Sequence, residues 1–89
     1  MLVLPAELTR LQATACLQML VQGLRTETGT AVLVDAAALG RFDSAALAVL
    51  LELRRESRAV GKTVAIRSMP DRLRDLASLY GVAELLPAG

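Results

Sequence analysis

Short apolar runs alternate along the chain with longer segments of helical periodicity. The apolar runs occupy residues 2–4, 30–35 and 63–67, and each has the length of a strand. The middle run, TAVLVD, is uninterrupted and rich in β-branched residues, which is typical of a central strand buried on both faces. We therefore expect this run at the centre of a sheet.

The first helical pattern lies between the first two apolar runs. Thr9 and Gln12 have the spacing of a capping box, so we expect a helix to open at Thr9. The connection to the next strand ends at Gly29. The apolar positions of this helix recur at helical spacing and are Leu17, Leu20, Val21 and Leu24.

Two further helical patterns follow the second and third runs. Asp43 is a favoured N-cap residue, and Gly61 is placed to close a helix that ends at Val60. The third helix is expected to start around Pro70 and to stop at Gly81. The predicted inward positions are Ala46, Val49, Leu50, Leu53 and Val60 in the second helix, and Leu73, Leu76, Ala77 and Tyr80 in the third.

Strands that alternate with helices at this spacing predict right-handed βαβ units. A chain of 89 residues has room for one compact core. We therefore predict a single α/β domain over residues 1–89, with a mostly parallel or mixed four-stranded sheet packed against helices. A short tail, residues 82–87, is expected to pack or pair after the third helix.

Composition narrows the function classes. Hydrophobic residues make up 54% of the chain, which excludes disorder as a description of the whole. The net charge is +1 and only 2% of the residues are aromatic, so nucleic-acid binding is disfavoured. The mean hydropathy of +0.47 is high for a small domain, which suggests that a partner covers some apolar surface.

The same residue counts bear on location. The single Cys16 cannot form an internal disulfide, which fits a reducing compartment. The longest uncharged stretch, residues 11–24, is shorter than the ~20 apolar residues of a membrane span, and the amino-terminal residues do not have the pattern of a signal peptide. We expect a cytoplasmic protein.

No pattern favours catalysis. The chain has no His to act as a base beside Ser44, and Cys16 falls in the middle of a helix. Asp35 and Asp43 have ordinary structural roles at a strand end and a helix start. We expect no enzyme activity, no catalytic residue, no metal and no cofactor.

The tripeptide at residues 61–63, GKT, resembles the end of a phosphate-binding P-loop. The first Gly of that motif would fall on Glu56, and the tripeptide follows a helix and precedes a strand, which is the reverse of the required order. We interpret it as a turn that ends a helix.

The informative segment is residues 41–51. If Asp43 is the cap, Ser44 is the first helical residue, where free amides and the helix dipole favour a phosphate or a hydrogen-bonding partner. From Ser44 to Leu51 the helix has no charge and is apolar on opposite sides. Two interpretations stay open: neighbouring helices bury both sides, or one side is a docking surface.

The chain resembles the STAS domains, a family named after sulfate transporters and anti-sigma factor antagonists and also called SpoIIAA-like. The resemblance rests on LPAELT at residues 4–9, LVD at 33–35, FDSAALA at 42–48 and GK at 61–62. The run LASLYGV at 76–82, followed by LP at 86–87, is similar to the MlaB subgroup. That subgroup implies a non-enzymatic cytoplasmic subunit, peripheral to the inner membrane, that binds and activates the MlaF ATPase of a phospholipid transporter maintaining outer-membrane lipid asymmetry in Gram-negative bacteria.

By this resemblance, Ser44 matches the residue that anti-sigma factor antagonists phosphorylate, so a phosphorylation-switched antagonist is the alternative function. Through the ATPase, the permease would be an indirect partner, and a weak homo-oligomer is left open. Ala46 and Ala6 stand where the family usually has Gly, and the chain begins at what is commonly the family's second strand, so we expect one sheet edge to be missing or supplied otherwise. The predicted partner interface comprises Arg41, Phe42, Asp43, Ser44, Ala45, Leu47, Ala48, Leu51 and Tyr80.

Overall fold

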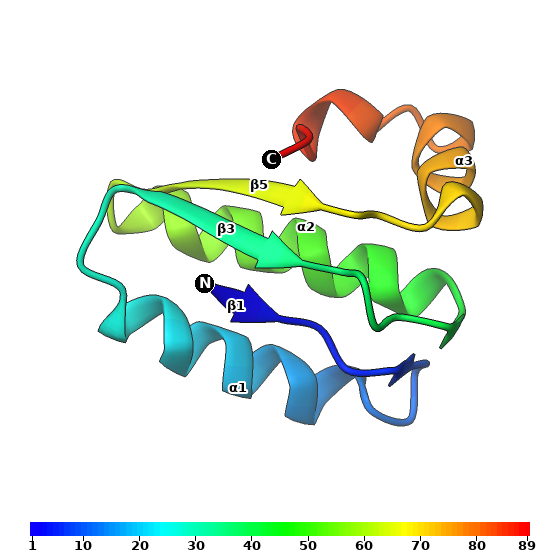
Figure 1. Cartoon of the computed structure of the whole chain (residues 1–89), viewed down its shortest axis with the longest axis horizontal. Helices are drawn as coiled ribbons and strands as arrows, with labels where there is room; N and C mark the ends of the chain where they lie inside the picture. Colours follow the sequence, from blue (N-terminus) through cyan, green and yellow to red (C-terminus); the bar gives the residue numbers. More distant parts are fainter.

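The computed structural model describes all 89 residues as an α/β domain (Figure 1). It contains five short strands, three α-helices and one 3₁₀ helix. In chain order these are β1 (Leu2–Val3), β2 (Glu7–Leu8), α1 (Ala13–Thr26), β3 (Ala31–Asp35), β4 (Arg41–Phe42), α2 (Ser44–Ala59), β5 (Thr63–Arg67), α3 (Asp71–Leu79) and the 3₁₀ helix η1 (Ala83–Leu85).

The strands form two separate sheets. The main sheet has the order β1-β3-β5 with all neighbours parallel, and β2 pairs with β4 in a second, two-stranded parallel sheet. The prediction of one four-stranded sheet is therefore wrong. After β1 the N–H of Leu4 still donates to the carbonyl oxygen of Asp35 at the end of β3. The next residue, Pro5, has no N–H to donate, and beyond it the chain pairs with β4 instead.

The C-terminal residues add a short bridge to the outer edge of β5. The N–H of Ile66 donates to the carbonyl oxygen of Pro87 at 2.8 Å, and the N–H of Gly89 donates to the carbonyl oxygen of Ile66 at 3.0 Å. The tail therefore pairs with β5 as predicted. The residue bridged to Ile66 is Ala88, which lies one residue beyond the predicted segment 82–87.

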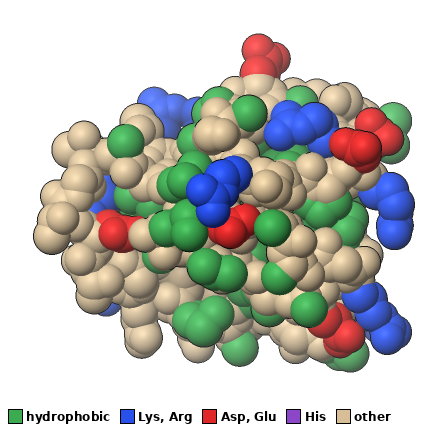
Figure 2. Space-filling model, in the orientation of Figure 1, with side chains coloured by type: hydrophobic (Ala, Val, Ile, Leu, Met, Phe, Trp, Pro, Cys, Tyr) green, Lys and Arg blue, Asp and Glu red, His purple; other side chains and the backbone are tan.

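Helices cover only one face of the main sheet. Figure 1 shows α2 passing behind β3 and β5. Val32 and Val34 of β3 point toward the helices and are buried, whereas Leu33 is only partly covered and Ala31 is exposed. The prediction that β3 is buried on both faces is wrong, because a continuous apolar run does not reveal whether helices lie on one side or on two. Figure 2 shows hydrophobic side chains on the uncovered face.

Local signals set the ends of α2. The Asp43 side chain accepts a hydrogen bond from the N–H of Ala45 at 2.8 Å, so the predicted N-cap is confirmed. At the other end Gly61 has a φ of +74°, and the N–H of Lys62 donates to the carbonyl oxygen of Ser57 at 2.8 Å. This is a Schellman turn, which confirms that the GKT segment closes a helix.

Helix α1 begins later than predicted. The N–H of Thr9 donates to the Gln12 side chain at 2.8 Å, and the N–H of Gln12 donates to the carbonyl oxygen of Thr9 at 3.0 Å. Residues 9–12 thus form a closed turn of their own, and the regular helix starts at Ala13. The capping-box pattern predicted the Thr9–Gln12 contact but not the first helical residue.

One hydrophobic core lies between the main sheet and the helices, with 21 buried apolar residues. Two residues predicted to face inward are exposed: Val60 at 57% and Tyr80 at 60%. Each stands directly before a glycine of positive φ, where the chain turns away from the helix and carries the side chain outward. None of the helices combines the length and apolar character that crossing a bilayer needs.

Candidate functional site

The amino end of α2 is held against the turn that precedes α1. One carboxylate oxygen of Asp43 caps α2 through the Ala45 N–H, and the other accepts from the N–H of Arg10 at 3.3 Å. In Figure 1 the amino ends of α1 and α2 lie at the same end of the molecule, where the strands of the main sheet finish. Asp43 therefore joins two segments far apart in sequence into one surface around Ser44.

The turn of residues 9–12 is stiffened by polar contacts and presents one bare apolar side chain. The Gln12 side-chain amide donates to Glu7 at 2.8 Å, and the other Glu7 oxygen lies 3.9 Å from the Arg41 guanidinium. Leu11, at the tip of the turn, is 83% exposed. Leu11 is not among the predicted interface residues, although its position between Thr9 and Gln12, off the apolar stripe of the helix, indicates an outward side chain.

A cation–π contact sets the opposite border of this surface. The Arg72 guanidinium at the start of α3 lies 5.1 Å from the centroid of the Phe42 ring. Phe42 and Arg72 line a shallow hollow with Asp43, Asp75 and Leu76. The amino ends of α2 and α3 are thereby adjacent, with Ser44 at the first position of α2.

Most of the predicted interface is accessible, but Leu47 is not. Arg41, Asp43, Ser44 and Ala48 are exposed, and Phe42, Ala45 and Leu51 are half-buried. Leu47 is 4% exposed and belongs to the core, so its prediction as a surface residue is wrong. Helix α2 packs against α1, β5 and α3, which leaves little of its circumference free. The sequence left open whether neighbouring elements bury both apolar sides of α2 or leave one side as a docking surface. At Leu47 the neighbouring elements bury the side chain.

Tyr80 lies apart from the rest of the predicted interface. It is the C-cap of α3, eight residues beyond Arg72, which corresponds to about 12 Å along a helix axis. The hollow that borders Asp43 does not include Tyr80. The structure therefore brings together the predicted residues of β4 and the start of α2 but leaves Tyr80 at a distance.

An apolar groove runs from this surface between α1 and α2. It has a volume of about 310 Å³, and its α2 wall includes Ala45 and Ala48, the lining residues nearest to Ser44 in the sequence. Small side chains at these two positions leave the groove open. Its remaining lining residues are Ala13, Thr14, Leu17, Val49 and Glu52. The amino end of α2 thus offers a mainly apolar, hollowed surface, in which Glu52 is the one charged lining residue.

Cys16 and Asp35, two of the residues considered for chemistry, are respectively buried and engaged in structural contacts. Burial raises the pKa of the Cys16 thiol, which disfavours the reactive thiolate. A hydrogen bond from the Ala37 N–H, together with the Arg67 guanidinium at 3.2 Å, lowers the pKa of Asp35. No group of three or more metal-ligating side chains gathers anywhere in the chain.

The side chain of Lys62, in the GKT segment, is also engaged in structural hydrogen bonds. Its ammonium group donates to the carbonyl oxygens of Leu24, at 3.1 Å, and of Glu27. These carbonyls belong to the end of α1, where a cation satisfies groups that the helix leaves unpaired. Lys62 therefore ties the end of α1 to the turn after α2.

Comparison with known protein families agrees with this architecture. The model described as "Mlab, STAS domain" matches residues 1–87, nearly the entire chain. No curated protein matches the chain. The match extends from β1 to the C-terminal segment and includes β4 and the start of α2 that surround Ser44. The chain therefore belongs to the STAS domain family, whose members are protein-interaction and regulatory modules.

Proposed function

We propose that the chain is a non-enzymatic, MlaB-like accessory subunit that docks onto the ATPase of an ABC-type phospholipid transporter, at the cytoplasmic side of the inner membrane. Docking would occur through the amino end of α2, and it would favour the assembled, active ATPase because the subunit binds that conformation better than others. The family match supports a protein-binding role, and the resemblance of residues 76–82 to the MlaB subgroup supports this partner.

The observation that carries the proposal is the surface around Ser44. Exposed Ala48 lines an apolar groove next to exposed Ser44, and the turn of residues 9–12, which Asp43 ties to this end of α2, carries Leu11 with 83% of its side chain exposed. When a partner covers water-exposed apolar surface of this kind, its burial stabilises the complex. Charged residues stand at its border, as at the rims of protein interfaces, and include Arg41, Asp43 and Arg72.

The test compares the same substitution at two exposed alanines of α2. Ala48→Arg places a long charged side chain in the groove, whereas Ala59→Arg places it at the far end of the helix, about 16 Å away. Each variant would be co-expressed with the transporter ATPase and its affinity measured after purification. We expect Ala48→Arg to abolish co-purification and Ala59→Arg to preserve it, with both variants folded by circular dichroism.

Equal retention of the two variants on the ATPase would overturn the assigned surface. Loss of both, with the fold intact, would place the contact along the whole of α2 and would also contradict the proposal. Leu47→Arg is not a suitable probe, because the buried position of Leu47 makes unfolding the expected result.

A second candidate function is an anti-sigma factor antagonist switched at Ser44. The accessible Ser44 at the first position of α2 favours it, since a kinase must reach the hydroxyl and helix amides attract a phosphate. Phosphorylation would add about −1.5 to −2 charge to the docking surface and release the partner. Intact mass after incubation with a cognate anti-sigma kinase tests this function: one added phosphate on the wild type and none on Ser44→Ala would support it, and no modification would contradict it.

A further inference from the structure

A hollow on the opposite half of the molecule has the donors of an anion site. It has a volume of about 330 Å³ and lies between the second half of α2, the start of β5 and the η1 segment. Arg54 and Arg58, one turn apart on α2, line it together with Thr63 and Val64. Its apolar wall is completed by Leu85 and Pro87.

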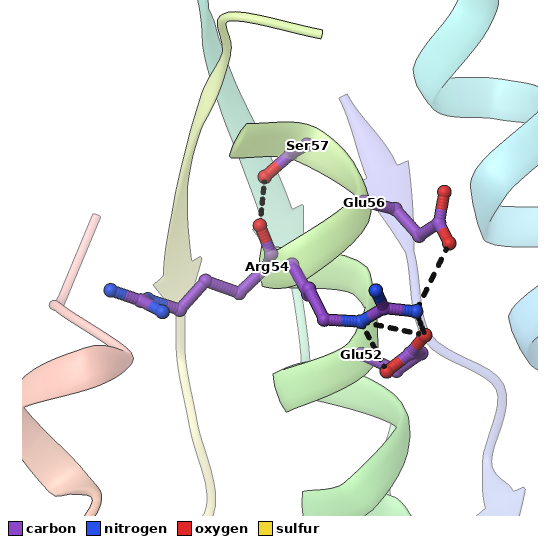
Figure 3. Close-up of polar contacts among 5 residues, drawn as sticks. Glu52, Arg54, Glu56 and Ser57 are labelled. Carbon is purple, nitrogen blue, oxygen red and sulfur yellow. Dashed lines mark hydrogen bonds and ion pairs between the residues drawn. The ribbon is translucent and has the colours of Figure 1, made fainter. Parts of the chain in front are cut away.

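Neither arginine has a carboxylate partner within ion-pair distance. The neighbouring Arg55 does: its Nε lies 3.1 Å from both carboxylate oxygens of Glu52, and its guanidinium lies 3.7 Å from Glu56. Figure 3 shows Arg54 extending away from Glu52 and Glu56, on the side of β5 and the C-terminal segment. The terminal carbonyl groups of α2 stabilise the positive charge of Arg58 in the last turn. Arg54 lies one turn earlier, so these carbonyl groups do not offset its charge.

The hollow also receives a backbone donor. Along β5 the N–H groups of Thr63 and Ile66 point to opposite edges, because Thr63 donates to Thr30 of the segment before β3 and Ile66 donates to Pro87. Strand alternation therefore directs the N–H of Val64 to the same edge as that of Ile66. The hydrogen bonds of the C-terminal bridge involve only Ile66, so the N–H of Val64 is left unpaired at this edge, where Val64 lines the hollow.

We propose that this hollow binds a small phosphate monoester. Its phosphate would lie between Arg54 and Arg58 and accept a hydrogen bond from the N–H of Val64. The two guanidinium groups come from α2 and the amide from β5. Donors from two elements suit a tetrahedral phosphate, which has several acceptor oxygens and a double charge. The apolar part of the ligand would rest on Leu85 and Pro87. Glu84 lines the hollow and would oppose the bound anion.

The experiment is a titration of the full chain with phenyl phosphate, followed by amide NMR, against sodium chloride of equal ionic strength. We expect the Val64 amide to shift with phenyl phosphate and not with chloride. Arg54→Gln and Arg58→Gln should each weaken binding by about tenfold, the effect of one charge-assisted hydrogen bond. The matched control Arg55→Gln should leave binding unchanged, and Glu84→Gln should strengthen it.

Three results would overturn the proposal. One is a Val64 shift that chloride reproduces, and another is an equal loss of binding in Arg55→Gln, which would indicate a diffuse charge effect. The third is equal or tighter binding of benzoate, which carries the same ring on a singly charged planar carboxylate. Circular dichroism of each variant separates loss of binding from loss of fold. The site lies away from the Ser44 surface, so its failure would leave the docking proposal intact.

Discussion

Two carboxylates of this domain, Asp43 and Asp35, link segments that lie far apart in the sequence. Asp43 caps α2 and accepts a hydrogen bond from Arg10, so one side chain positions both parts of the candidate docking surface. Asp35 plays a similar part at the end of β3, where it contacts Ala37 and Arg67. The sequence predicted that both residues would have structural roles, since acceptors at strand ends and helix starts commonly bind nearby N–H groups. The contact with Arg10 was not predictable, because it joins residues 33 positions apart.

The lowered pKa of Asp35 leads to a prediction at this scale. Because its pKa is below the ordinary carboxyl value in the folded chain, its contribution to stability is present above that ordinary value and is lost as the pH falls through the folded-state pKa. We expect Asp35→Asn to be less stable than the wild type at pH 7 and the gap to narrow in acid. Urea unfolding at pH 7 and pH 3 measures the difference in unfolding free energy between Asp35→Asn and the wild type. A difference that is the same at both pH values would contradict the assigned role of Asp35.

At the scale of elements, predictions succeeded where a local signal was sufficient. The bounds of α2 and β5 follow from Asp43, Gly61 and the apolar run between Thr63 and Arg67. The two-residue strands β2 and β4 were missed, because their pairing joins residues far apart in the sequence, such as Glu7 and Arg41, and no short pattern encodes it. Periodicity likewise showed that α2 is apolar on two sides but not that its neighbours cover Leu47.

The Schellman turn after α2 gives a prediction for Gly61. Its φ of +74° is costly for any residue with a Cβ, so Gly61→Ala should lower the free energy of unfolding by about 1–2 kcal/mol. Gly29→Ala is the matched control, because φ there is not positive and the nearest atom to an added Cβ is 3.9 Å away. Its expected effect is within about 0.5 kcal/mol. Equal effects of the two substitutions in urea unfolding would refute this explanation.

Substitutions of Leu47 and Leu11 by alanine test which of the two leucines belongs to the core. Leu47→Ala removes a buried side chain and should cost about 2–5 kcal/mol of unfolding free energy, as cavity-forming substitutions do. Leu11→Ala, at an 83% exposed position, should change stability by less than about 0.5 kcal/mol. If thermal or urea unfolding found the two variants equally stable, the assignment of Leu47 to the core would be incorrect.

At the scale of the whole molecule, the two proposed sites lie on different halves of the surface. One end, where the strands finish, carries the mainly apolar groove and Ser44, and the other half carries the arginine-lined hollow. The sequence indicated that apolar surface was in excess of what a small core needs. It could not locate that surface fully, because Leu11 becomes part of it only through the fold.

The most direct test of the docking surface is amide hydrogen exchange of the domain with and without the transporter ATPase. We expect slower exchange on binding for residues 9–12 and 43–48, and unchanged exchange for residues 58–64 at the far end of α2 and beyond it. Protection confined to residues 58–64, with residues 43–48 unaffected in a stable complex, would contradict the assigned docking surface.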